Sequence, residues 1–93
     1  MRAIWNNTVI ADSDKTIELE GYHYFPLESV RLEFLQPSDY STVCEWKGEA
    51  KYYHVVVDGK LCENAAWSYP KPKWKGRKFK NRVAFWKKVQ VVA

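Results

Sequence analysis

The segment from Thr42 to Tyr53 holds the densest set of residues that could do chemistry. Within twelve positions it has one thiol, two carboxylates, two ammonium groups and three aromatic rings. A cysteine becomes a nucleophile when a cation, a histidine or a helix N-terminus lowers its pKa. Cys44 has lysines nearby in sequence, and His23 or His54 could approach it in the fold. An enzyme that uses Cys44 is therefore one hypothesis, and a small half-buried apolar cysteine is the other.

A pocket for a small anionic ligand is the interpretation that we favour for this segment. Ligand pockets combine mostly apolar walls with a few placed polar groups. Aromatic rings would supply the walls, and lysine, arginine and histidine would supply the charge, with arginine suited to bidentate carboxylate or phosphate. Alternatively, the rings are simply core and the lysine stem runs along them into water. The predicted ligand-binding residues are His23, Tyr24, Arg31, Cys44, Trp46, Lys47, Tyr52, Trp67 and Tyr69.

Metal and cofactor chemistry has little support in the sequence. Two cysteines and two histidines match the ligand count for zinc, but no close pair such as Cys-x2-Cys is present. Nucleotidyl transfer needs paired carboxylates for Mg²⁺ and a loop that holds phosphates. Asp12-Ser13-Asp14 offers two carboxylates, yet the chain has only four glycines and no glycine-rich loop. We expect no metal and no cofactor, and we interpret Asp12-Ser13-Asp14 as a turn.

The last third of the chain is strongly basic. Residues 1–63 contain six basic and all eleven acidic residues, whereas residues 64–93 contain nine basic residues and no acid. Cations interleaved with rings are typical of proteins that bind single-stranded nucleic acid weakly, although charge runs are more often solvated surface. We keep nucleic-acid binding through the basic strip of residues 71–82 as an alternative. Its candidate residues are Lys71, Lys73, Trp74, Lys75, Arg77 and Lys78.

The elements that must position these residues are short strands. Ninety-three residues make one domain, residues 1–93, with too many rings (five Trp, six Tyr and four Phe) for all to be buried. Asn6-Asn7 and Asp58-Gly59 are hairpin turns between alternating segments. The expected strands are 3–5, 8–11, 16–20, 22–25, 31–35, 51–57, 60–62, 82–86 and 89–92, with a helical turn at 26–30. We expect a turn at 36–39, strand or turn at 63–69, and a loop at 71–76.

No segment keeps a helical period over ten positions, so we predict an all-β domain. It would be a small, strongly twisted antiparallel sheet or half-closed barrel of about eight short strands. Trp46-Lys47-Gly48 recurs as Trp74-Lys75-Gly76, but the flanking residues differ and we do not interpret this as an internal repeat.

The expected compartment and partners depend on apolar stretches, cysteines and exposed rings. No apolar stretch fits a signal peptide or a spanning helix, so we expect a cytoplasmic protein with no membrane association. Cys44 and Cys62 are then expected to be free thiols. Exposed rings and unpaired strand edges leave a homodimer open.

Six short stretches carry a resemblance to a known family. They are His23 to Pro26, Leu35 to Ser38, Cys44-x-Trp46-Lys47-Gly48-x-Ala50-x-Tyr52, Val57-Asp58-Gly59, Trp67-x-Tyr69 and Val83-Ala84-Phe85. With these stretches the sequence resembles the bacterial domain of unknown function family 427, sometimes labelled nucleotidyltransferase-like. The resemblance implies a stand-alone all-β cytosolic protein and implies no particular activity. The residue run from Lys71 to Lys80 is more basic than the family leads us to expect. We therefore treat the central Cys-x-Trp-Lys-Gly segment and the basic strip as two separate features.

Overall fold

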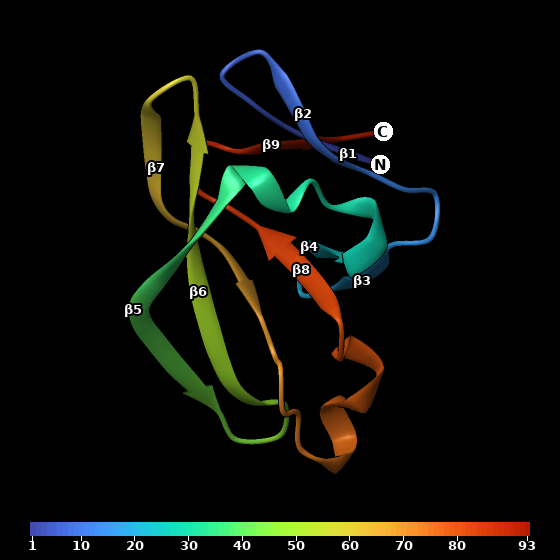
Figure 1. Cartoon of the computed structure of the whole chain (residues 1–93). Coiled ribbons are helices and arrows are strands. Elements are labelled where there is room, and N and C mark those ends of the chain that lie inside the picture. Colours follow the sequence, from blue (N-terminus) through green and yellow to red (C-terminus); the bar gives the residue numbers. More distant parts are fainter.

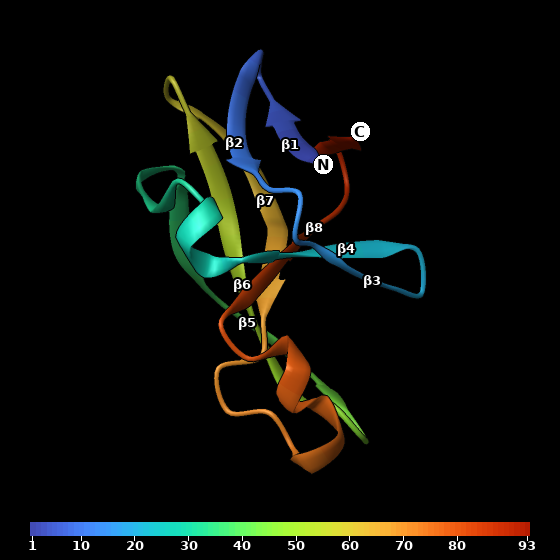
Figure 2. The same cartoon turned by 90° about the vertical axis from the view of Figure 1, so that its right-hand side faces the viewer.

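The computed structural model describes residues 1–93 and contains two antiparallel sheets with no closed barrel (Figures 1 and 2). The predicted all-β class is confirmed. A three-stranded sheet has the order β2-β1-β9, and a six-stranded sheet has the order β3-β4-β8-β7-β6-β5. The strands are β1 (Arg2–Trp5), β2 (Thr8–Asp12), β3 (Ile17–Leu19), β4 (Tyr22–Pro26), β5 (Leu35–Cys44), β6 (Gly48–Val57), β7 (Lys60–Ser68), β8 (Arg82–Phe85) and β9 (Gln90–Val92). Three 3₁₀ turns complete the fold: η1 (Leu27–Ser29), η2 (Leu32–Phe34) and η3 (Trp74–Phe79).

The two predicted hairpin turns are confirmed. Asn6 and Asn7 have φ of 51° and 58° and join β1 to β2. Asp58 and Gly59 have φ of 52° and 76° and join β6 to β7. Both turns have positive φ at their two central residues, as type I′ turns require.

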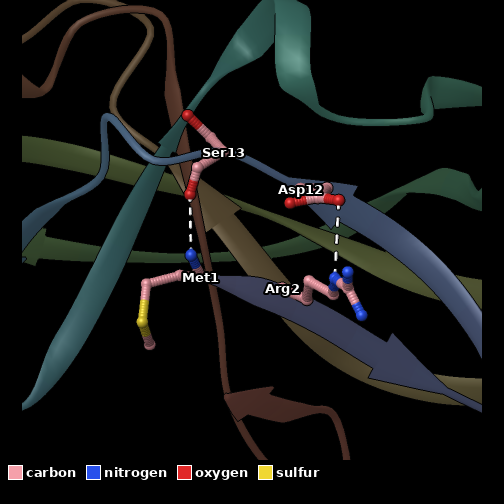
Figure 3. Close-up of polar contacts among 4 residues, drawn as sticks. All are labelled: Met1, Arg2, Asp12 and Ser13. Atoms are coloured by element: carbon pink, nitrogen blue, oxygen red, sulfur yellow. Dashed lines mark hydrogen bonds and ion pairs between the residues drawn. The ribbon is translucent and has the colours of Figure 1, made fainter. Parts of the chain in front are cut away.

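Polar contacts join the N-terminal residues to the end of β2 (Figure 3). The Met1 ammonium donates to the Ser13 carbonyl oxygen at 2.8 Å, and the Ser13 amide donates to the Met1 carbonyl at 3.0 Å. Arg2 Nε lies 3.5 Å from a carboxylate oxygen of Asp12. Asp12 is the last residue of β2, so the turn predicted at Asp12-Ser13-Asp14 begins one residue later, and the chain bends at Asp14.

The six-stranded sheet buries both of its faces, and strand alternation assigns neighbouring residues to different cores. Register pairs Trp67 with Ala84 and Ser68 with Val83, so each pair lies on one face. One face carries an aromatic cluster, whose buried members are Tyr24, Ala50, Tyr52, Trp67, Tyr69, Phe79 and Ala84. The other carries a mainly aliphatic cluster that the small sheet covers through Ala3, Ile10 and Ala11. Its remaining buried members are Phe25, Val30, Val55, Val57, Cys62, Ala65, Ala66, Val83, Phe85 and Val89.

The expected strand at 31–35 and turn at 36–39 are wrong. Residues 32–34 form η2, because Val30 bridges to Ala11 and the Arg31 amide donates to Ile10, which turns the chain away from the small sheet. The next strand, β5, then runs through residues 36–39. Pro37 is tolerated there because β5 is an edge strand, and the pairing with β6 is irregular between Pro37 and Ser41.

Other expectations need smaller changes. The helical turn after Pro26 is present as η1, and the segment 63–69, left open between strand and turn, is strand as far as Ser68. The segment 71–76, expected as a loop, enters η3 at Trp74. No helix of the structure is long and apolar enough to span a membrane.

Candidate functional site

Lys47 is the only buried charged residue of the chain, with 7% of its surface exposed. It lies in the turn between β5 and β6, directly before Gly48. Gly48 has a φ of +114°, and the backbone of residues 71–73 would lie 3.2–3.3 Å from an added Cβ. The turn therefore needs glycine next to the lysine, both for its conformation and for close packing.

Four aromatic rings surround the Lys47 ammonium. Its Nζ lies 5.2 Å from the ring centroid of Trp46, 5.3 Å from Tyr69, and 5.9 Å from Tyr24 and Phe79. Each distance is within the range of a cation–π interaction, which is strongest where water is excluded. These rings replace part of the hydration that a buried ammonium loses.

One carboxylate accompanies the ammonium. Glu20 Oε1 lies 3.7 Å from Lys47 Nζ, and 64% of the Glu20 side chain is exposed. Glu20 and Gly21 both have positive φ and form the turn between β3 and β4. Because the carboxylate is largely solvated, water screens this ion pair and either partner can exchange it for another ion.

The pKa of Lys47 lies above its ordinary value. Burial lowers this pKa, but the phenol groups of Tyr24 and Tyr69 more than offset that effect. Burial and the neighbouring Tyr24 raise the pKa of Tyr69, and Lys47 lowers it only in part. At neutral pH the site therefore contains a charged ammonium and a neutral Tyr69 phenol.

A cavity of about 190 Å³ opens beside the ammonium. The phenol groups of Tyr24 and Tyr69 interact with the Lys47 ammonium, whereas the Tyr52 hydroxyl lies 3.2 Å from Thr42 Oγ1. Tyr22 and Trp86 pack edge-on against the Trp67 ring, with centroid distances of 5.0 and 5.7 Å. The cavity is lined by Glu20, Tyr22, Tyr24, Lys47, Tyr52, Trp67, Tyr69 and Trp86.

The basic strip is part of this site's framework, which corrects our separation of the two features. Figures 1 and 2 show η3 beside the β5–β6 turn. The Lys73 amide donates to the Lys47 carbonyl oxygen at 2.9 Å, and Lys73 Nζ donates to the Glu45 carbonyl oxygen at 2.9 Å. A Cβ on Gly76 would lie 2.7 Å from Lys47 Cα. The two Trp-Lys-Gly segments, though not a repeat, therefore pack against each other.

The remaining strip residues lie on the surface. Trp74 is 73% exposed, and the Arg77 guanidinium carbon lies 4.0 Å from its ring centroid. Lys78 Nζ lies 5.4 Å from the Phe79 ring centroid, while Lys71 and Lys75 are exposed.

The structure brings together five of the nine predicted ligand-binding residues as cavity lining: Tyr24, Lys47, Tyr52, Trp67 and Tyr69. Trp46 adds its ring to Lys47, and Cys44 packs against the aromatic cluster. His23 and Arg31 do not line the cavity. His23 Nε2 lies 3.8 Å from Glu18, its buried Nδ1 has no hydrogen-bond partner, and Arg31 is exposed at the start of η2.

Neither histidine contacts Cys44 by a hydrogen bond, as a thiol–imidazole dyad would require. The other histidine, His54, accepts a hydrogen bond from the Asn64 amide through Nδ1. Cys44 and Cys62 are both free thiols. The Asp12-Ser13-Asp14 segment does not line the Lys47 cavity, and Asp12 pairs with Arg2 on the small sheet (Figure 3).

Sequence reasoning missed four residues: Glu20, Tyr22, Phe79 and Trp86. Tyr22 could have been found, because it alternates with Tyr24 and so shares its face. Phe79 also gave a signal, as an apolar ring within a run of lysines. Glu20 and Trp86 gave none, because each reaches the cavity through a turn whose direction depends on the tertiary fold.

Comparison with known proteins places the chain in a family. The family model NTP_transf_9, described as "Domain of unknown function (DUF427)", matches residues 1–93, and the chain therefore belongs to that family. A search of curated proteins returned no match.

Proposed function

We propose that this member of the DUF427 family is a binding module whose Lys47 cavity takes a small oxyanion, either a carboxylate or a phosphate. The observation that carries the proposal is the convergence of three donors on one cavity: the Lys47 ammonium and the Tyr24 and Tyr69 hydroxyls. Charged donors make the stronger hydrogen bonds to oxyanions, and phenol hydroxyls can add neutral ones.

The protonation state supports binding over amine catalysis. A lysine that forms Schiff bases needs a lowered pKa, so that a neutral amine is present near pH 7. Lys47 has a raised pKa and stays charged. A fixed cation suits an anion receptor.

Glu20 suggests how the cavity is kept ready. Its exposed carboxylate balances Lys47 when no ligand is bound, and an incoming oxyanion would take its place. The small volume of about 190 Å³ limits the ligand to a compact group, with the rings of Trp67 and Trp86 beside it. Most of the binding free energy would therefore come from charge and hydrogen bonds.

Titration of intrinsic tryptophan fluorescence with acetate, benzoate and inorganic phosphate tests the proposal. At least one of these should give a saturable change, and Lys47→Met should weaken its binding about tenfold or more, since a charge-assisted hydrogen bond contributes about 1.5–3 kcal/mol. Lys75→Met removes an exposed charge from the adjacent segment and is the matched control. The proposal fails if no anion saturates the signal by about 10 mM, a binding free energy below about 3 kcal/mol.

One observation favours a second candidate, weak binding of single-stranded nucleic acid. Trp74 is 73% exposed with the Arg77 guanidinium against its ring, which leaves ring surface for a base to stack on. Fluorescence anisotropy of a labelled oligonucleotide should show binding that falls steeply with salt and is lost in Trp74→Ala. Lys60→Gln, at the β6–β7 turn, controls for net charge; equal weakening in both variants would argue against a stacking site.

A further inference from the structure

The Lys47 cavity contains charges of both signs. The Lys47 ammonium and the Glu20 carboxylate both line it, with their nearest atoms 3.7 Å apart. Lys47 is buried, whereas the Glu20 side chain is largely exposed in the turn between β3 and β4. An oxyanion that binds Lys47 would therefore leave the Glu20 carboxylate without its partner beside the same cavity. A ligand that also carries a positive charge would supply a new partner for it.

Part of the aromatic lining has no cation against it. Lys47 Nζ interacts with the rings of Tyr24 and Tyr69, and Lys87 Nζ lies 5.5 Å from the Trp86 ring centroid. No lysine or arginine of the chain lies within cation–π distance of the other three lining rings. Their electron-rich faces are therefore free of charge pairing within the protein. These rings are Tyr22, Tyr52 and Trp67.

The three free rings face in different directions. The planes of Tyr22 and Trp67 meet at 84° with centroids 5.0 Å apart, and Tyr52 is tilted by 34° from Trp67 at 6.0 Å. Rings at such different angles can surround a rounded cation, as aromatic cages surround methylated ammonium groups. The indole of Trp67 accepts no hydrogen bond, and the Tyr52 hydroxyl is paired with Thr42. This setting suits a quaternary ammonium, which has no N–H, better than a primary ammonium with three donors.

We propose that the ligand of the Lys47 cavity is a compact zwitterion, a carboxylate joined by a short link to a quaternary ammonium group. This inference rests on the proposed oxyanion site and specifies what it binds. The carboxylate would bind Lys47, and the methylated cation would lie against Tyr22 and Trp67 with Glu20 as its counter-ion. Both charges of the empty site would thus be paired again, which a simple anion cannot achieve. The volume of about 190 Å³ restricts the ligand to a small molecule of this kind.

Titration of the ¹⁵N-labelled protein with glycine betaine and with 3,3-dimethylbutanoate tests the proposal. The two molecules have nearly the same shape and the same carboxylate, but only glycine betaine has a positive charge. Glycine betaine should bind about tenfold more tightly, because the aromatic rings and Glu20 attract that charge. The indole N–H shifts of Trp67 and Trp86 should change and saturate, whereas those of Trp74, which does not line the cavity, should stay constant.

Glu20→Gln should change the two affinities in opposite directions. Glycine betaine should bind several-fold more weakly, because its cation loses a counter-ion. 3,3-Dimethylbutanoate should bind several-fold more tightly, because it no longer displaces a carboxylate from Lys47. Glu18→Gln, whose carboxylate faces His23, should change neither affinity. A general loss of structure would weaken both ligands together and could not produce this result.

Tyr22→Leu removes one wall of the proposed cage. Tyr22 is 36% exposed, so we expect the variant to fold. It should weaken glycine betaine about fivefold and 3,3-dimethylbutanoate much less, because leucine keeps an apolar surface but offers no π face. Trp74→Leu is the control, since it removes an exposed ring that lies outside the cavity and should change neither affinity.

Two results would overturn this proposal and leave the oxyanion site standing. One is glycine betaine that binds no more tightly than 3,3-dimethylbutanoate, and the other is tetramethylammonium that binds as tightly as glycine betaine. In either case, saturable binding of acetate, benzoate or phosphate would still support an oxyanion receptor at Lys47. If none of these compounds, the simple anions included, saturates the indole shifts by about 10 mM, both proposals fail.

Discussion

The two faces of the six-stranded sheet differ in whether they bury a positive charge. On the aromatic face, four rings and a solvated carboxylate surround Lys47. The buried cluster of the aliphatic face contains no charged residue. The difference shows that one sheet can present two chemically distinct environments, because adjacent residues of a strand point to opposite sides.

The faces also differ in what covers them. The small sheet covers much of the aliphatic face, whereas the segment 71–80 covers the aromatic face through Phe79 and Gly76. A single segment with few strand contacts thus positions the Lys47 site. The experiments below test whether the two faces respond separately.

The largest effect should come from truncating the cover of the aromatic face. Phe79 has no exposed surface and packs 4.7 Å from Tyr24, centroid to centroid. Phe79→Ala should lower the free energy of unfolding by about 3–5 kcal/mol, measured by urea denaturation, and should weaken anion binding at Lys47. Phe85→Ala, buried on the other face, should cost a similar amount but leave anion affinity of the folded protein unchanged. Equal loss of anion affinity in both variants would mean that the faces are not independent.

A smaller effect is expected from Gly76→Ala. The added Cβ would lie 2.7 Å from Lys47 Cα and 2.8 Å from its carbonyl oxygen, so one backbone must shift. We expect a loss of about 1–3 kcal/mol in the free energy of unfolding, as for overpacking elsewhere. Lys75→Ala, an exposed neighbour in η3, should stay within about 0.5 kcal/mol of the wild type. If Gly76→Ala is equally neutral, the close contact does not position Lys47.

Removing the Glu20 carboxylate should change anion affinity more than the free energy of unfolding. Glu20→Gln should strengthen anion binding at Lys47 several-fold, because the ligand no longer displaces a competing charge. Its effect on the free energy of unfolding should stay below about 1 kcal/mol, since the pair is largely exposed. Glu18→Gln is the control on the preceding strand β3, where the carboxylate faces His23. Weaker binding in Glu20→Gln would show that Glu20 belongs to the receptor itself.

The smallest effect is expected in the response to pH. The pKa of Lys47 is raised, so its stabilising charge is fully present below about pH 10.4 and is lost as pH rises through the folded-state value. Tyr69, also raised, works in the same direction. Stability and acetate binding should be constant from about pH 6 to 9 and fall above about 10.

The sequence was sufficient for the elements that short turn motifs define. The Asn6-Asn7 and Asp58-Gly59 hairpins and five cavity residues follow from local patterns. It was insufficient where long-range contacts decide. Residues 32–34 alternate like a strand but form η2 because of backbone contacts to β2. No spacing in the chain indicates that Glu20 pairs with Lys47, because that pairing depends on how the β3–β4 turn lies relative to the β5–β6 turn.

The alternation within β7 also sets where the chain can gain or lose a residue. One extra residue after Ala66 would exchange the faces of Trp67 and Ser68, placing an indole in the aliphatic cluster and a hydroxyl among the rings. The packing of both faces would be lost in one step. An extra residue at the Asp58-Gly59 turn lies outside the paired register and would spare both. We therefore expect length variation among functional homologues to be confined to the hairpin tips and absent from the middle of β7.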